Sequence, residues 1–282
     1  MGERTSNLTC QTDIMHTATL SDTEFQQFKS WLYEAAGINL SPAKKALVAG
    51  RLAKRLKHHE LSSYGEYFRL ITHKSEAAEF QLALDLLTTN ETYFFREPKH
   101  FDYLRTHILP KVPPGKTFRV WCGASSSGEE PYTIAMTLAD GLASTPWEIV
   151  ASDISTRMLE KARSGHYPME RAEDIPRPLL SRHCLKGTGS QAGTFLMEAS
   201  LRSRVQFMQI NLNESLPKIG EFDIIFLRNV MIYFDMETKR QVVARMLPLL
   251  KPGGYFFVSH SESLNGITDS LKMISPSIYR KP

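Results

Sequence analysis

The sequence has little cysteine, and its cysteines form no pattern. Only three of the 282 residues are cysteine, namely Cys10, Cys122 and Cys184, and none stands in a C-x-x-C pair or in a Cys/His cluster. Disulfide frameworks and zinc sites depend on such spacings. We therefore expect neither a disulfide-stabilised fold nor a metal site, and the cytoplasm is the natural compartment for the chain.

The sequence also lacks long hydrophobic runs and a strong excess of charge. No segment approaches the roughly 20 apolar residues that a membrane helix needs, and the polar, Thr- and Ser-rich N-terminus has no apolar core of a signal peptide. A net charge of +4 is too small to require a nucleic acid partner. We expect no nucleic acid and no direct membrane insertion, so work at a membrane would proceed through a partner.

The length and the hydrophobic content of 42% suit one large domain and one small domain. Residues 1–20 are polar and are predicted to form a disordered tail. Ser21 and Glu24 form a capping-box pattern that opens a small helical domain over 21–88. A linker over 89–97 then leads into an α/β domain over 98–282.

The segment from Phe118 to Met136 predicts a strand, a tight turn of small residues and a helix. Phe118, Val120 and Trp121 favour a strand, the turn from Gly123 to Gly128 allows close backbone approach, and Pro131 suits the first turn of a helix. The turn lacks the G-x-G-x-x-G pattern of dinucleotide folds, which disfavours a pyrophosphate ligand.

The acids near this turn suit a ligand with hydroxyl or ammonium groups. Glu129 and Glu130 follow the turn, where they would repel phosphate. S-adenosylmethionine carries both kinds of group. Asp153 ends the next predicted strand, where it could accept hydrogen bonds from a ribose diol. The alternative is that Asp153 to Ser155 only caps the following helix.

Strands and helices alternate through the C-terminal half. A strand over 222–227 runs into Arg228-Asn229 and Tyr233, a helix over 236–250 follows, and a Pro-Gly-Gly turn leads into a further strand. This order predicts a doubly wound parallel sheet with helices on both faces.

Four motifs together resemble the CheR family of chemotaxis receptor glutamate O-methyltransferases. The resemblance covers Ser21 to Tyr279, and any one of the motifs alone would be weak. They are Asn90-Glu-Thr-Tyr-Phe-Phe-Arg96, Ser127-Gly-Glu-Glu-Pro-Tyr-Thr-Ile-Ala135, Leu227-Arg-Asn-Val-Met-Ile-Tyr-Phe234 and Lys251-Pro-Gly-Gly-Tyr255.

The resemblance implies a Rossmann-like S-adenosylmethionine methyltransferase domain with an inserted small antiparallel β subdomain at about 166–208, preceded by a small all-α domain. It implies methylation of glutamate carboxylates on the cytoplasmic part of bacterial chemoreceptors, with S-adenosylhomocysteine as the product. The protein would then be recruited to membrane-embedded receptor arrays, and we expect it to act as a monomer.

The resemblance also implies site residues. Arg96 and Tyr233 are the candidates for the catalytic step, as groups that hold a carboxylate and orient the methyl or the acceptor. A glutamate acceptor with a pKa near ~4.3 is already ionised at neutral pH, so no general base is needed. The cofactor-binding candidates are Asn90, Thr92, Arg96, Gly123, Glu129, Asp153, Asn211, Leu212, Arg228 and Asn229.

The helix predicted after Ser41-Pro42 carries a basic face. Lys44, Arg51, Lys54 and Arg55 fall on one side of the helical wheel, opposite an apolar side. By itself such a face is more often only solvated. The resemblance favours a dock for the glutamate-rich receptor region.

The inserted segment carries Gly187, Gly189 and Gly193 before an extended stretch. By resemblance, this subdomain could tether a C-terminal receptor peptide by strand addition. The alternative is an insertion that only stabilises the fold.

Two rival functions stay open. The chain could methylate another substrate, such as a nucleic acid or a small molecule. It could also be a non-catalytic S-adenosylmethionine-binding regulator whose basic helix contacts nucleic acid.

Overall fold

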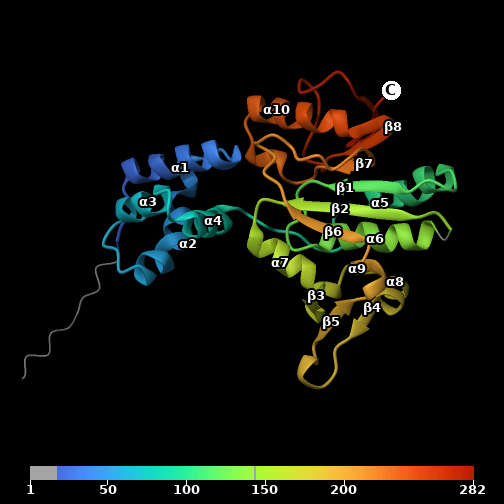
Figure 1. The fold of residues 1–282 in the computed structure, drawn as a ribbon, viewed down its shortest axis with the longest axis horizontal. Helices are drawn as coiled ribbons and strands as arrows, with labels where there is room; N and C mark the ends of the chain where they lie inside the picture. Colours follow the sequence, from blue (N-terminus) through green and yellow to red (C-terminus); the bar gives the residue numbers. More distant parts are fainter. Residues whose placement is uncertain (1–17, 143) are drawn as a thin grey trace, which may run out of the picture.

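A computed structural model describes residues 18–142 and 144–282 of the chain. An N-terminal helical domain lies beside a larger α/β domain (Figure 1). The helical domain consists of α1 (Asp22–Ala36), a 3-10 turn (Pro42–Lys44), α2 (Lys45–His58), α3 (Tyr64–Thr72) and α4 (Ala77–Leu87).

The predicted capping box starts the first helix. The Ser21 hydroxyl accepts from the Glu24 amide and the Glu24 carboxylate accepts from the Ser21 amide, so that two amides at the helix start are satisfied. Leu20 is 2% exposed and belongs to the core of the helical domain. The predicted tail therefore extends too far at Leu20, because this apolar side chain packs under the helices, and residues 1–17 of that prediction lie outside the described residues.

The α/β domain is built on a seven-stranded sheet in the order β6-β2-β1-β7-β8-β10-β9. The pairs from β6 to β8 are parallel, whereas β10 pairs antiparallel with both β8 and β9. The sheet is therefore mixed rather than wholly parallel, since the chain returns at its end as a hairpin. The strands are β1 (Phe118–Cys122), β2 (Trp147–Asp153), β6 (Val205–Gln209), β7 (Phe222–Phe226), β8 (Leu250–Phe257), β9 (Lys272–Ser275) and β10 (Ile278–Arg280).

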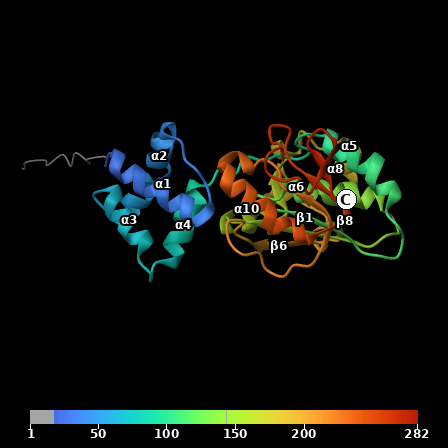
Figure 2. The same ribbon diagram turned by 90° about the horizontal axis from the view of Figure 1, so that it is seen from above.

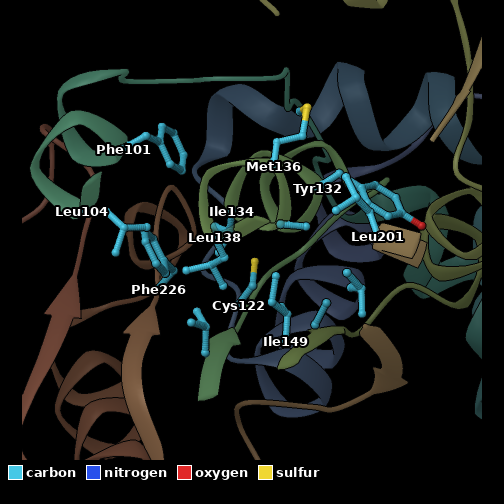
Figure 3. Close-up of a cluster of buried hydrophobic side chains, with 14 of the residues drawn as sticks. Phe101, Leu104, Cys122, Tyr132, Ile134, Met136, Leu138, Ile149, Leu201 and Phe226 are labelled. Atoms are coloured by element: carbon cyan, nitrogen blue, oxygen red, sulfur yellow. The ribbon is translucent and has the colours of Figure 1, made fainter. Parts of the chain in front are cut away.

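Helices cover both faces of this sheet. Along β1, Val120 and Cys122 join the core under α5 (Lys99–Tyr103) and α6 (Glu129–Gly141), while Trp121 joins the core under α10 (Met236–Met246). This alternation is the period-two pattern of a strand with two buried faces. Figure 3 shows the first of these cores, with Ile134 and Leu138 pointing toward the sheet. A further helix, α7 (Thr156–Ser164), packs on β2 and β6.

Two predicted boundaries in this region are wrong. The helix predicted to end at residue 250 ends at Met246 and continues as a 3-10 turn over Leu247–Leu249, where Pro248 cannot donate a helical hydrogen bond. The predicted Pro-Gly-Gly turn lies inside β8, where the register with β7 shifts between Phe222 and Ile224.

The inserted subdomain is a separate three-stranded antiparallel sheet in the order β3-β5-β4. It consists of β3 (His166–Pro168), α8 (Arg177–His183), β4 (Cys184–Lys186) and β5 (Thr194–Met197), and it lies to one side of the main sheet in Figure 1. A short α9 (Ala199–Arg202) follows. The insertion ends before Val205 rather than at 208, because Val205–Gln209 pairs with β2 of the main sheet.

Hydrogen bonds join the two domains, which adjoin in both views (Figure 2). Asn39 donates its amide to the Tyr233 carbonyl at 2.8 Å, and the Asn211 side chain donates to the Ala35 carbonyl at 2.7 Å. The buried Asp85 of α4 accepts from the Arg157 amide at the start of α7. Among the described residues, no helix combines the length and apolarity needed to cross a membrane.

Candidate cofactor site

A cavity lies between the helical domain and the carboxyl ends of the central parallel strands. Its walls come from the linker after α4, from the turns that follow β1, β2, β6 and β7, and from Ala36 and Ile38 of the helical domain. In doubly wound sheets ligands bind at this edge, where the strand order reverses. The fold therefore places a small-molecule site here.

The cavity brings together nearly all residues predicted for the cofactor. Tyr233, the second catalytic candidate, lies with them on the same wall. The predicted residues that line the cavity are Asn90, Thr92, Arg96, Gly123, Asp153, Asn211, Leu212, Arg228 and Asn229.

Glu129 is the exception, because it is not among the residues that line the cavity, and its role in cofactor binding stays a prediction. Its side chain is buried, accepts from the Ser127 hydroxyl at 2.7 Å and lies 3.7 Å from the Arg171 guanidinium. Burial raises the pKa of this carboxyl. Glu130 lines the cavity instead. Consecutive residues of a helix point about 100° apart, so the two adjacent acids project in different directions.

Asp153 supports the loops around the cavity. Its carboxylate accepts from the Ser126 amide at 2.8 Å and from the Ser155 amide at 2.9 Å, and burial raises its pKa. The helix cap itself is Ser155, whose hydroxyl accepts from the Met158 amide. Asp153 is therefore not the N-cap residue of α7. It lies at the end of β2 and lines the cavity.

Arg228 is a fully buried cation at the end of β7. It donates to Glu130 at 2.6 Å, to Glu97 at 3.0 Å and to the Arg96 carbonyl at 2.6 Å. Its guanidinium also lies over the Phe101 ring, 5.5 Å from the centroid. A buried charge is stable only when it has partners. Through these contacts Arg228 connects the linker, the start of α6 and the end of β7. Sequence reasoning missed Glu97 and Glu130 in this role.

The backbone around the cavity is strained. Phe95, Glu97, Ser126 and Asn229 all have φ between 47° and 59°, which is the left-handed region that non-glycine residues rarely adopt. Such strain persists only where the surrounding contacts fix it, and it gathers at ligand sites. Here it coincides with the segments that line the cavity.

Arg96 and Tyr233 both border the cavity. Arg96 donates to the Glu91 carbonyl at 2.8 Å and lies over the Tyr93 ring. Burial raises the pKa of the Tyr233 phenol, and the nearby Arg96 charge opposes the rise without cancelling it. Tyr233 therefore keeps its proton at neutral pH and can donate a hydrogen bond into the cavity.

The four predicted docking cations on and just before α2 divide into two kinds. Arg55 forms an ion pair with the buried Glu79 at 2.6 Å, and Arg51 donates to the Leu87 and Thr88 carbonyls at the end of α4. Both arginines therefore have partners within the helical domain, and their part in receptor docking stays a prediction. Lys44 and Lys54 are exposed.

Glu79 sits at the centre of a hydrogen-bonded group. Its burial opposes ionisation, but the hydrogen bonds from Arg55, Tyr67 and His59 outweigh this and lower its pKa to about 2. The basic face predicted from the sequence is therefore partly an internal ion pair.

The three predicted tether glycines shape the loop between β4 and β5. A Cβ on Gly187 would lie 2.0 Å from the Gln191 carbonyl oxygen, and Gly189 and Gly193 have φ of 56° and 82°. They are thus required for the turn, and they lie on the inserted sheet, away from the cofactor cavity.

The sheet order, the cavity at the strand ends and the acid-rich turn without a pyrophosphate pattern define the class of S-adenosylmethionine-dependent methyltransferases. The family model of the CheR methyltransferase SAM binding domain matches residues 90–280, and that of the CheR methyltransferase all-alpha domain matches residues 23–88. The chain belongs to the CheR methyltransferase family, and its cofactor is S-adenosylmethionine.

Named relatives agree over most of the chain. The chain is 45% identical to "Chemotaxis protein methyltransferase 2" of Pseudomonas aeruginosa over 260 residues, which cover 91% of this chain and 92% of the relative. It is 40% identical to "Chemotaxis protein methyltransferase" of Escherichia coli over 283 residues, with 98% of each chain covered. The protein of the same name from Salmonella typhimurium is 40% identical, with 92% of this chain and 90% of the relative covered.

Proposed function

We propose that this protein transfers the methyl group of S-adenosylmethionine to glutamate carboxylates of chemoreceptors. The observation that carries the proposal is the cavity itself, in which residues from all of the motif segments before β8 meet at the carboxyl edge of the sheet. The names of the relatives, which are chemotaxis protein methyltransferases, support the receptor as the substrate.

The residues of the cavity suit the parts of this cofactor. Asp153 can accept from ribose hydroxyls, and Ile154, Ile210 and Leu212 offer apolar contact to an adenine ring. Arg96 can hold a carboxylate. Glu130 also lines the cavity, with its carboxylate paired to Arg228.

The reaction asks for positioning rather than for proton removal. Bound S-adenosylmethionine supplies an electrophilic methyl group, and the acceptor glutamate is ionised at neutral pH. The protein has to align the acceptor oxygen with the methyl and keep water out. We assign this alignment to Tyr233, which donates from its phenol, and to Arg96, which attracts the acceptor or cofactor carboxylate.

The helical domain would present the receptor to this cavity. Lys44, at the end of the 3-10 turn before α2, and Lys54 of α2 are exposed and would attract an acidic receptor segment. Arg51 connects α2 to Thr88, which lines the cavity, so a segment docked on α2 would lie near the transfer site. The inserted sheet offers its edge strands β3 and β4 for a receptor peptide.

Receptor labelling tests the proposal. We would incubate the protein with methyl-labelled S-adenosylmethionine and receptor-bearing membranes, and then measure label released by alkali as methanol. Carboxyl methyl esters release it, whereas methylated amines and nucleic acids do not.

We expect Arg96→Ala and Tyr233→Phe to lower incorporation by about ten- to a hundredfold, as for loss of a positioning group. Tyr103→Phe is the control, because Tyr103 stacks on His107 outside the cavity. Absence of alkali-labile label in the receptor, or label in added RNA instead, would contradict the proposal.

A further inference from the structure

Three potential metal ligands meet behind the cofactor cavity. Glu97 ends the linker, His100 lies in α5, and His260 follows β8. One ligand atom of each lies within 4.8 Å of the other two. The Glu97 carboxylate is 3.5 Å from His100 Nδ1 and 4.0 Å from His260 Nε2.

The two nitrogens of His100 have different surroundings. Nε2 lies 2.8 Å from the Ser277 hydroxyl, which is also 2.7 Å from the Pro276 carbonyl. In the tautomer in which Nε2 donates to Ser277, His100 Nδ1 carries a lone pair that can bind a metal ion. His100 is 1% exposed, and Nδ1 has no hydrogen-bond partner among the described residues.

In that tautomer Nδ1 faces the Glu97 carboxylate at 3.5 Å, and a metal ion between them would be a partner for both groups. The ring of His260 packs edge-on against His100, with centroids 4.7 Å apart, and brings a second imidazole to the same point. Imidazole nitrogens with one carboxylate are a typical ligand set for zinc and its neighbours.

The spacing suits such an ion. With bonds of about 2.0–2.1 Å, the ligand atoms of a tetrahedral zinc site lie about 3.4 Å apart. The 3.5 Å distance from Glu97 to His100 is already near this value, whereas the 4.0 Å distance to His260 is longer. His260 is partly exposed, so its ring can close the remaining gap and leaves a route for the ion to enter.

We propose that Glu97, His100 and His260 form a binding site for one divalent transition metal ion, with solvent at the fourth position. One oxygen of Glu97 already accepts from Arg228 at 3.0 Å and from the His260 amide at 3.1 Å, while Arg228 also pairs with Glu130. The second oxygen of Glu97 is left to bind the metal, so that the carboxylate can keep Arg228. The site could not be predicted from the sequence, because His260 is remote from the other two ligands along the chain.

Cobalt and zinc titrations test the site. The full chain would be purified without a histidine tag and stripped with a chelator. Cobalt binding is read from the intense visible absorption of tetrahedral Co²⁺, and zinc binding from calorimetry. The test variant is His260→Ala, since this partly exposed side chain can be removed without opening the core. The matched control is His58→Ala, an exposed histidine of α2.

We expect one equivalent of Co²⁺, displaced by Zn²⁺, in the unaltered protein and in His58→Ala. We expect at least a tenfold weaker affinity in His260→Ala, at an unchanged thermal unfolding midpoint of the metal-free protein. No stoichiometric binding, or binding that survives His260→Ala, would overturn the proposal.

Discussion

The cofactor cavity and the surface of α2 are both rich in charge, but they use it differently. In the cavity Arg228 is fully buried and pairs with Glu97 and Glu130. At α2, Lys54 and the preceding Lys44 are exposed to solvent. Charges in a dry environment interact far more strongly than charges in water, so the first group holds structure in place, while the second acts weakly and at longer range.

Arg55 lies between these two extremes. It belongs to α2, but its ion pair with the buried Glu79 makes it a structural cation, as Arg228 is in the cavity. Whether a cation stabilises the fold therefore depends more on the burial of its partner than on the helix that carries it. This difference can be tested by removing each cation in turn.

The largest effect is expected for Arg228→Leu. The change leaves Glu97 and Glu130 without their shared cation, and loss of one partner of a buried pair typically costs about 3–5 kcal/mol. We expect the free energy of unfolding to fall by this amount in denaturant titration, together with loss of cofactor binding. Arg105→Ala is the control, since its pair with Asp102 is exposed and should contribute less than about 1 kcal/mol. Equal effects of the two changes would refute the distinction.

The next largest effect is expected for Arg55→Ala, which should lower the free energy of unfolding by about 3 kcal/mol. This change leaves the buried Glu79 carboxylate of the helical domain without its ion-pair partner. Thermal unfolding would detect it, and Lys54→Ala on the same helix should leave the midpoint within about one degree. If Arg55→Ala were as neutral as Lys54→Ala, the ion pair would not contribute to the fold.

Glu79 also predicts a dependence on pH. Its folded-state pKa of about 2 lies below the value near ~4.3 of an unfolded glutamate. Its contribution is therefore complete above pH ~4.3 and is lost as the pH falls toward 2. Unfolding measured between pH 5 and pH 2 should show this loss, and Glu79→Gln should flatten the curve. An unchanged slope in Glu79→Gln would contradict the assignment.

The smallest effect is expected at the exposed lysines. The double change Lys44→Ala and Lys54→Ala should raise the KM for receptor a few-fold, because exposed charges contribute mainly through attraction at a distance. The difference from the unaltered protein should shrink as salt is added. Affinity for S-adenosylmethionine should not change, and a loss of cofactor binding would show that the lysines serve the fold instead.

The sequence could predict which segments line the cavity, because the order of strands and helices determines where the strand ends lie. Asp153 and Arg228-Asn229 each end a parallel strand, and such ends must meet at one edge of the sheet. It could not separate Glu129 from Glu130, since both open the same helix and the packing of α6 places Glu130 at the cavity. It could not show the internal partners of Arg51 and Arg55, because those partners, Leu87, Thr88 and Glu79, lie on α4 or at its end.

Calorimetric binding of S-adenosylmethionine to Asp153→Asn and Glu129→Gln tests the central claim most directly. Both carboxyls are buried, but only Asp153 lines the cavity. A hydrogen bond to a charged group contributes about 1.5–3 kcal/mol, so we predict a dissociation constant about ten- to a hundredfold higher for Asp153→Asn, and within about twofold of the unaltered protein for Glu129→Gln. A large loss with Glu129→Gln and none with Asp153→Asn would contradict the cofactor site described here.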